Sequence, residues 1–182
     1  MNHRERLQTV LRGGIPDHVP VAPDFSNMIP ARLTGKPFWD LYLYNDPPIW
    51  EAYIAAARLF DAAGIPTHVH SCGPERALVK IFAEETTLTV IDPLEVPPMG
   101  DCILSDLKRL YGGKLTLKGN LHTTEVILRS TVEDVIAASR RAIDDAAAGG
   151  RFILSTGDQC GRDTPDDNIR AMVETARTYG RY

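Results

Sequence analysis

Residues 114–160, KLTLKGNLHTTEVILRSTVEDVIAASRRAIDDAAAGGRFILSTGDQC, indicate the fold class of this chain. The stretch begins with a short apolar strand pattern at 114–117 and ends with another at 152–154. The segment 131–148 between them is typical of a helix, because Thr131 precedes two acidic residues and a glycine pair follows the last alanine. A strand, a helix and a second strand in this order predict a parallel βαβ unit.

The same alternation extends to both sides of this unit. Further strands are predicted at 67–70 and 88–91, and further helices at 48–63, 74–85, 103–111 and 164–179. The proline-rich start predicts a helix at 3–12, a strand at 18–22 and one helical turn at 38–43. Short strands that alternate with helices predict an α/β fold whose parallel sheet is covered by helices. We therefore expect an irregular N-terminal arm with helices at 1–64 and a half-barrel of four βα units at 65–182, forming one structural domain.

Length and composition limit the possible classes of protein. With 182 residues the chain is too short for a complete eight-stranded β/α barrel, which takes about 250 residues. A formal net charge of −4 and the lack of a basic block argue against nucleic-acid binding. No apolar run approaches the roughly 18 residues of a membrane span, and the charged start is unlike a signal peptide. The sequence therefore predicts a cytoplasmic protein.

Polar residues follow each of the four predicted strands. The four segments are His70-Ser71-Cys72-Gly73, Asp92-Pro93-Leu94-Glu95, Gly119-Asn120-Leu121-His122 and Gly157-Asp158-Gln159-Cys160. Catalytic groups of parallel α/β folds lie just past the carboxyl ends of the strands. The sequence therefore predicts a functional site at this edge of the sheet.

His70 and Cys72 have the spacing of two ligands on one strand end. Alternate residues of a strand point the same way, so both side chains can reach one ion. Cys160 follows the fourth strand, and Asp92 or Glu95 could add a fourth ligand. Three such ligands with one exchangeable position are typical of catalytic zinc. Burial of the cysteines as small apolar residues is the alternative interpretation.

Other polar residues have two interpretations each. His122 either contacts substrate or caps the turn that follows it. Asp158 is either a substrate-binding or general-acid group, or a partner of backbone amides, and Asp24 has the same two interpretations. Cys102 is expected to be structural. Three cysteines far apart do not indicate a disulfide framework.

Several ordered motifs resemble those of the uroporphyrinogen decarboxylase family. They are Arg4-Glu5-Arg6-Leu7, Pro16-Asp17-His18-Val19-Pro20-Val21, His70-Ser71-Cys72-Gly73, Lys118-Gly119-Asn120-Leu121, Ser130-Thr131-Val132-Glu133-Asp134-Val135, Phe152-Ile153-Leu154-Ser155-Thr156-Gly157-Asp158 and Thr164-Pro165-Asp166-Asp167-Asn168-Ile169. The resemblance is loose before residue 60 and close over 66–182. It implies a (β/α) barrel fold, of which this chain would form a part.

The resemblance also implies a function. The family contains porphyrinogen decarboxylases and zinc-dependent methyltransferases that work with methylcorrinoid proteins. The decarboxylases carry an arginine-rich segment near the N-terminus, where this chain has APDFSNM at 22–28. His70, Cys72 and Cys160 match the zinc ligands of the methyltransferases in type and order. The implied reaction is transfer of a methyl group from a methylcorrinoid, such as methylcobalamin, to a thiol such as coenzyme M.

From their places at the strand ends and loops, Asp158, His122 and Asp24 are candidate catalytic residues, and Asn120 and Ser71 are candidate cofactor-binding residues. Two alternatives stay open. One is a tetrapyrrole decarboxylase, for which Arg32 and Arg162 are candidate carboxylate binders, and the other is an inactive remnant that binds a corrinoid or a partner subunit. About three βα units of a full barrel are missing, so we expect a homodimer that covers the open sheet edges.

Overall fold

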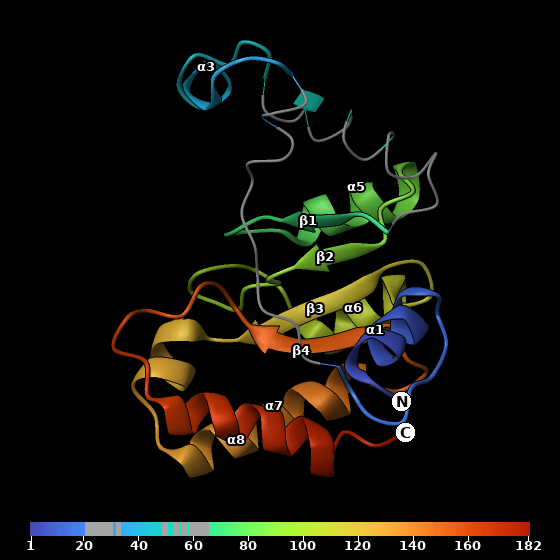
Figure 1. Cartoon of the computed structure of the whole chain (residues 1–182), viewed down its shortest axis with the longest axis vertical. Helices are drawn as coiled ribbons and strands as arrows, with labels where there is room; N and C mark the ends of the chain where they lie inside the picture. The colour runs from blue at the N-terminus through green and yellow to red at the C-terminus, as the bar shows by residue number, and fades with distance from the viewer. Residues whose placement is uncertain (21–30, 32–33, 49–50, 53–54, 56–57, 59–65) are drawn as a thin grey trace. The chain divides into compact units, whose positions relative to one another are not determined.

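Four parallel strands alternate with helices in the larger part of the chain, as the sequence predicts (Figure 1). The elements are α1 (His3–Leu11), β1 (His68–His70), α5 (Arg76–Glu85), β2 (Val90–Asp92), α6 (Leu104–Tyr111), β3 (Thr116–Leu121), η1 (Thr123–Leu128), α7 (Val132–Ala146), β4 (Phe152–Thr156) and α8 (Asp166–Thr178). These bounds come from a computed structural model that describes residues 1–20, 31, 34–48, 51–52, 55, 58 and 66–182. The chain divides into two units, one of residues 1–23 and 68–182 and the other of residues 24–67.

The sheet has the strand order β1-β2-β3-β4, and every neighbouring pair is parallel. His70 lies opposite Asp92, and Asn120 lies opposite Ser155. The carboxyl ends of the strands therefore meet at one edge, where the sequence predicts the functional site. Strand β3 extends beyond the predicted 114–117, because Lys118 and the residues after it continue the ladder with β4.

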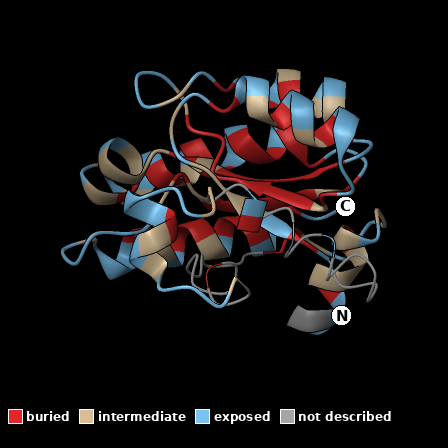
Figure 2. Ribbon diagram, turned by 90° about the horizontal axis from the view of Figure 1, so that it is seen from above, coloured by how far each residue is buried: buried red, intermediate tan, exposed pale blue. Residues whose placement is uncertain are grey.

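The core lies between the strands and the helices that cover them. Strands β2, β3 and β4 are buried almost throughout, whereas the residues of β1 are exposed or half-buried. In Figure 2 the buried strands are red, and the helices show pale blue where they face outward. Leu117, Phe152 and Leu154 are completely buried, and Val135 and Ile143 of α7 belong to the same apolar cluster. Burial of both sheet faces explains why these strands appear as short apolar runs without a polar alternation.

Helix α7 begins as the sequence predicts. The Thr131 side chain accepts the Asp134 backbone N–H, and the Asp134 carboxylate accepts the Thr131 N–H, which is a capping box. Helix α8 differs, because Pro165 and not Thr164 occupies its N-cap position. Asn168 on α8 is buried, and its Nδ2 donates to the carbonyls of Ile127 and Ser130 at 2.9 and 3.0 Å.

One element was not predicted. Residues Thr123–Leu128 form η1, a single π-helix segment, where the sequence suggested a turn. The segment is rich in β-branched residues, which have low helix propensity. Burial of Ile127 in the core and capping by His122 compensate for that low propensity.

The predicted strand at 18–22 is absent from its described residues, 18–20. Instead, the Val19 N–H donates to the Gly180 carbonyl at 2.8 Å, so the two ends of the chain lie side by side (Figure 1). The predicted helix at 48–63 lies mostly outside the described residues.

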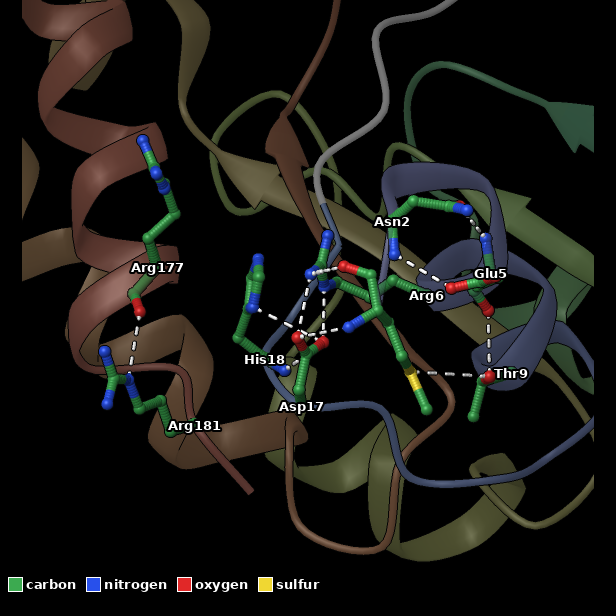
Figure 3. Close-up of polar contacts among 9 residues, drawn as sticks. Asn2, Glu5, Arg6, Thr9, Asp17, His18, Arg177 and Arg181 are labelled. Atoms are coloured by element: carbon green, nitrogen blue, oxygen red, sulfur yellow. Dashed lines mark hydrogen bonds and ion pairs between the residues drawn. The ribbon is translucent and has the colours of Figure 1, made fainter.

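An arginine–aspartate pair holds α1 to the segment that follows it (Figure 3). Arg6 is 5% exposed, and its Nε and Nη2 donate to the two carboxylate oxygens of Asp17 at 2.6 and 2.9 Å. The hydrogen bond from Arg6 holds the pKa of the Asp17 carboxyl well below its usual range. This pair explains the conformation of a charged segment that has little apolar surface to bury.

The unit of residues 24–67 contains α3 (Phe38–Leu43), at the position of the predicted helical turn. Leu41 is buried with Ala31 and Ala52, and the Phe38 ring stacks on Tyr42 with 5.2 Å between ring centroids. The proposed division at residue 64 and the proposed homodimer stay predictions. No helix among the described residues combines the length and apolarity needed to span a membrane.

Candidate metal centre

Three side chains of types that can ligate a metal meet at the carboxyl edge of the sheet. His70 ends β1, Cys72 lies two residues beyond it, and Asp158 lies two residues beyond β4. One ligand atom of each residue lies within 4.8 Å of the others. His70 Nε2 is 3.1 Å from Cys72 Sγ and 3.5 Å from Asp158 Oδ1, and Cys72 Sγ is 3.6 Å from Asp158 Oδ2.

These separations are close to those of a zinc site. An ion about 2.0–2.3 Å from each ligand in tetrahedral geometry sets neighbouring ligand atoms about 3.3–3.7 Å apart. Two of the three separations lie in that range, and the 3.1 Å between His70 Nε2 and Cys72 Sγ is shorter. Imidazole nitrogen, thiolate sulfur and carboxylate oxygen are all zinc ligands, and three protein ligands leave the fourth position open for a water or a substrate. The group of His70, Cys72 and Asp158 therefore fits a catalytic zinc site in both chemistry and spacing.

The environment of the Cys72 thiol favours a role as a metal ligand over a role as a free nucleophile. Burial raises its pKa to about 12, and the carboxylates of Asp158 and Glu95 add to the effect. A reactive cysteine has the opposite environment, in which positive charge lowers the thiol pKa. A bound cation would place positive charge beside the thiol, and metal binding displaces the thiol proton.

Asp92 orients His70 from behind. Its Oδ1 is 3.0 Å from His70 Nδ1 and 2.8 Å from His68 Nε2, and its Oδ2 accepts from Lys118 Nζ at 2.6 Å. Burial alone would raise the pKa of the Asp92 carboxyl, but the hydrogen bonds from His68, His70 and Lys118 hold it well below its usual range. A carboxylate on one ring nitrogen leaves the other nitrogen, Nε2, as the metal ligand.

Asp92 was predicted as a possible fourth metal ligand. Both of its oxygens instead face protein partners, and the residue is 1% exposed. The structure therefore places Asp92 behind the candidate ligand His70. Lys118, the buried cation that pairs with Asp92, was not predicted. The signal available in the sequence was a lysine inside the apolar run of β3.

Two buried glutamates connect the loops around Cys72. Glu95 Oε2 accepts the Gly73 N–H at 2.6 Å, and Glu75 Oε2 accepts the Leu94 N–H at 2.7 Å. Glu95, on the loop after β2, therefore holds the loop after β1, and Glu75, on the loop after β1, holds the loop after β2. Glu95 was also predicted as a possible metal ligand, and in the structure one of its oxygens fixes the loop that carries Cys72.

Glu75→Gln should make the protein more stable at pH 8. Glu75 is 1% exposed, its Oε1 has no hydrogen-bond partner among the described residues, and burial raises its pKa to about 7. A raised carboxyl pKa means that the folded state favours the protonated form, so stability falls as pH rises from about 4.5 through 7. The variant removes this loss, about 2–3 kcal/mol at pH 8.

Urea unfolding of wild type and Glu75→Gln at pH 5 and pH 8 checks this prediction. The gain should be larger at pH 8 than at pH 5. Glu84→Gln on the exposed side of α5 is the matched control, for which we expect no such pH dependence. Equal stability of wild type and Glu75→Gln at pH 8 would contradict the prediction.

Four other predicted residues lie around this group. Cys160 is exposed and stands outside the group of His70, Cys72 and Asp158, although its loop is the one that carries Asp158. His122 Nδ1 accepts the N–H groups of Thr124 and Glu125 at 3.3 and 3.2 Å and so caps η1. The Ser71 N–H donates to the Asp92 carbonyl at 2.9 Å.

Asn120 Nδ2 donates to the Leu94 carbonyl at 3.1 Å, which ties β3 to the loop after β2. Cys102 is buried in the core, as expected of a structural cysteine. Asp24, a predicted catalytic residue, lies outside the described residues. A cavity of about 150 Å³ adjoins the metal-binding group, and its lining includes Asn120, His122 and Asp158.

The sequence also matches a family model. The model described as uroporphyrinogen decarboxylase (URO-D) matches residues 48–179, which is more than half of the chain. The chain belongs to the uroporphyrinogen decarboxylase family. This confirms the family that the sequence motifs predict.

Two further comparisons give individual proteins to which the chain is similar. It is 29% identical over 152 residues to methylcobamide:CoM methyltransferase MtbA of Methanosarcina mazei, a match that covers 81% of this chain and 39% of that protein. The fold is similar to that of a methyltransferase from Methanosarcina mazei, with a TM-score of 0.57 and 17% identity over 70% of this chain and 35% of that structure. The structural match confirms the predicted partial barrel. The chain spans about two fifths of the length of the curated relative.

Proposed function

We propose that this member of the uroporphyrinogen decarboxylase family is a zinc-dependent methyltransferase, which moves a methyl group from a methylcorrinoid to a thiol acceptor. The observation that carries the proposal is the group of His70, Cys72 and Asp158, with His70 oriented by a buried aspartate. The relative MtbA, whose name describes methyl transfer from a methylcobamide to CoM, supports the choice of reaction.

Zinc held here would supply a Lewis acid that lowers the pKa of the acceptor thiol to near neutrality. His70 and Cys72 are two of its proposed ligands. Cys160 is the third, because its thiolate is a softer donor than a carboxylate and it lies on the same loop as Asp158. Asp158 would be the remaining ligand, and it is the one that we propose the acceptor thiol replaces.

The residues of this chain have separate tasks in the proposed reaction. Asp92 keeps the His70 ring in one orientation, and Lys118 keeps Asp92 ionised inside the core. Asp158, once displaced, is a base beside the incoming thiol and can accept its proton. The sulfur–carbon bond then forms as the cobalt–carbon bond breaks, and the electron pair stays on the cobalt of the corrinoid.

The decarboxylase alternative has less support from the described residues. It requires arginines that bind the carboxylates of a tetrapyrrole. The Arg162 side chain is 90% exposed and pairs with its neighbour Asp163. Arg32, the other candidate, lies outside the described residues.

Incubation of the zinc-loaded chain with methylcobalamin and 2-mercaptoethanol tests the proposal. The readouts are the cobalamin absorption spectrum and the methyl thioether measured by mass spectrometry. Loss of a residue that hydrogen-bonds to a metal ligand lowers activity by about 10–100-fold. Cys72→Ala removes a proposed ligand itself, so it should lower the methylation rate by at least about 100-fold. Cys102→Ala is the control that removes a cysteine outside the group. Absence of the thioether from folded, zinc-loaded wild type would contradict the proposed function.

A further inference from the structure

A small cavity lies directly beside the proposed metal centre. It has a volume of about 150 Å³ and is lined by residues from the loops that follow β2, β3 and β4. Asp158 belongs to both places, because it lines the cavity and its Oδ2 is 3.6 Å from Cys72 Sγ. A molecule whose sulfur reached the metal centre would therefore extend its other end into this cavity.

The size of the cavity limits the ligand. The volume of the cavity is about 150 Å³. That volume holds a tail of a few non-hydrogen atoms. It suits the substituent of a two-carbon thiol, and it is too small for a corrinoid.

The hydrogen bonds of the lining define its polarity. His122 Nδ1 accepts two backbone N–H groups, so the ring proton is on Nε2 and the side chain is a donor. Asn120 uses its Nδ2 on the Leu94 carbonyl, which leaves Oδ1 as an acceptor. Two residues of the lining therefore have a donor and an acceptor left for an uncharged polar group.

Two carboxylates give the cavity a negative charge. Glu95 is held by the Gly73 N–H at 2.6 Å, and Asp158 is held by the Gln159 N–H at 2.6 Å. Neither carboxylate faces a lysine or arginine among the described residues that line the cavity. If a zinc ion compensates the charge of Asp158, the charge of Glu95 still remains at the wall. An anionic group that entered the cavity would be repelled.

We infer that this cavity binds the tail of the acceptor thiol and selects an uncharged or cationic tail over an anionic one. The inference rests on the proposed function, since it names the class of thiol that would be methylated. The acceptor is then a short thiol with a hydroxyl or ammonium group, and a sulfonate or carboxylate on the same two-carbon chain is disfavoured.

Three thiols with the same two-carbon chain test the inference. They are 2-mercaptoethanol, cysteamine and 2-mercaptoethanesulfonate (coenzyme M), and calorimetry on the zinc-loaded full chain measures their dissociation constants. A single charge several ångströms away at a partly exposed site changes binding by about five- to tenfold. We expect the sulfonate to bind about five- to tenfold more weakly than 2-mercaptoethanol, and the difference should shrink at high salt.

Gln159→Lys adds a cation to the cavity wall and should remove or reverse this preference. Gln8→Lys is the matched control, because it makes the same change on α1, outside the lining of the cavity. The control should keep the preference of wild type.

The outcomes separate the inference from the proposed function. Tighter binding of the sulfonate by wild type, or equal binding of all three thiols with no effect of Gln159→Lys, would overturn the selectivity and leave thiol methylation standing. Failure of every thiol to bind and to be methylated would overturn both. The expected order of affinities, together with its change in Gln159→Lys only, supports the inference.

Discussion

Lys118→Met will lower the free energy of unfolding by about 3–5 kcal/mol, because it removes the buried lysine that pairs with Asp92 and leaves that carboxylate only His68 and His70 as partners. Lys118 and Asp92 have side chains that are both 2% exposed, and Nζ lies 2.6 Å from Oδ2. A methionine fills the same space, so the cost comes from the uncompensated charge and not from a cavity. Urea unfolding followed by circular dichroism measures the change.

The controls for this prediction separate charge from packing. Lys80→Met on α5 removes an exposed lysine and should change stability by less than about 0.5 kcal/mol. Combining Lys118→Met with Asp92→Asn should recover part of the loss, because the double variant no longer buries a charge. A loss below about 1 kcal/mol in Lys118→Met would show that the pair contributes little to the fold.

The second prediction concerns the identity of the metal ligands. Wild-type protein loaded with zinc and separated by size should hold about one zinc per chain, measured by mass spectrometry, as expected for a single site. Cys72→Ser and Cys160→Ser should lose the metal, because each removes a thiolate. Asp158→Asn should keep it, because Asp158 is proposed to hold the exchangeable position. Cys102→Ser is the matched control and should keep it as well.

The reverse result is equally informative. Loss of zinc in Asp158→Asn and its retention in Cys160→Ser would assign the third ligand to Asp158. That assignment matches the group of His70, Cys72 and Asp158, whose ligand atoms lie within 4.8 Å of one another. Wild type that folds but holds no zinc would contradict the proposed metal centre.

The same experiment has a pH dependence with a definite sign. The raised pKa of Cys72, about 12, means that zinc must displace a thiol proton at neutral pH. Zinc affinity should therefore rise with pH, by up to about tenfold per pH unit for each thiol that loses a proton. An affinity that does not change between pH 6 and pH 8 would argue against a thiolate ligand.

The sequence by itself determined the elements that depend on neighbours in the chain. The capping box at Thr131 and Asp134 predicts the start of α7, because both partners lie within one helical turn. The spacing of His70 and Cys72 predicts that both point to one place, because the period of a strand is two residues. The order of strands and helices, together with the motifs, was enough to predict the family.

Tertiary structure decided how residues far apart in the chain combine. Lys118 and Asp92 are 26 residues apart, and Cys72 and Asp158 are 86 apart, so only the parallel order of the strands brings them together. For the same reason Asp92 lies behind His70, where strand register places it opposite that residue. The sequence identified the edge of the sheet where the chemistry lies. The packing of four strand ends assigned each side chain its place there, because hydrogen bonds and burial depend on neighbours that no local pattern specifies.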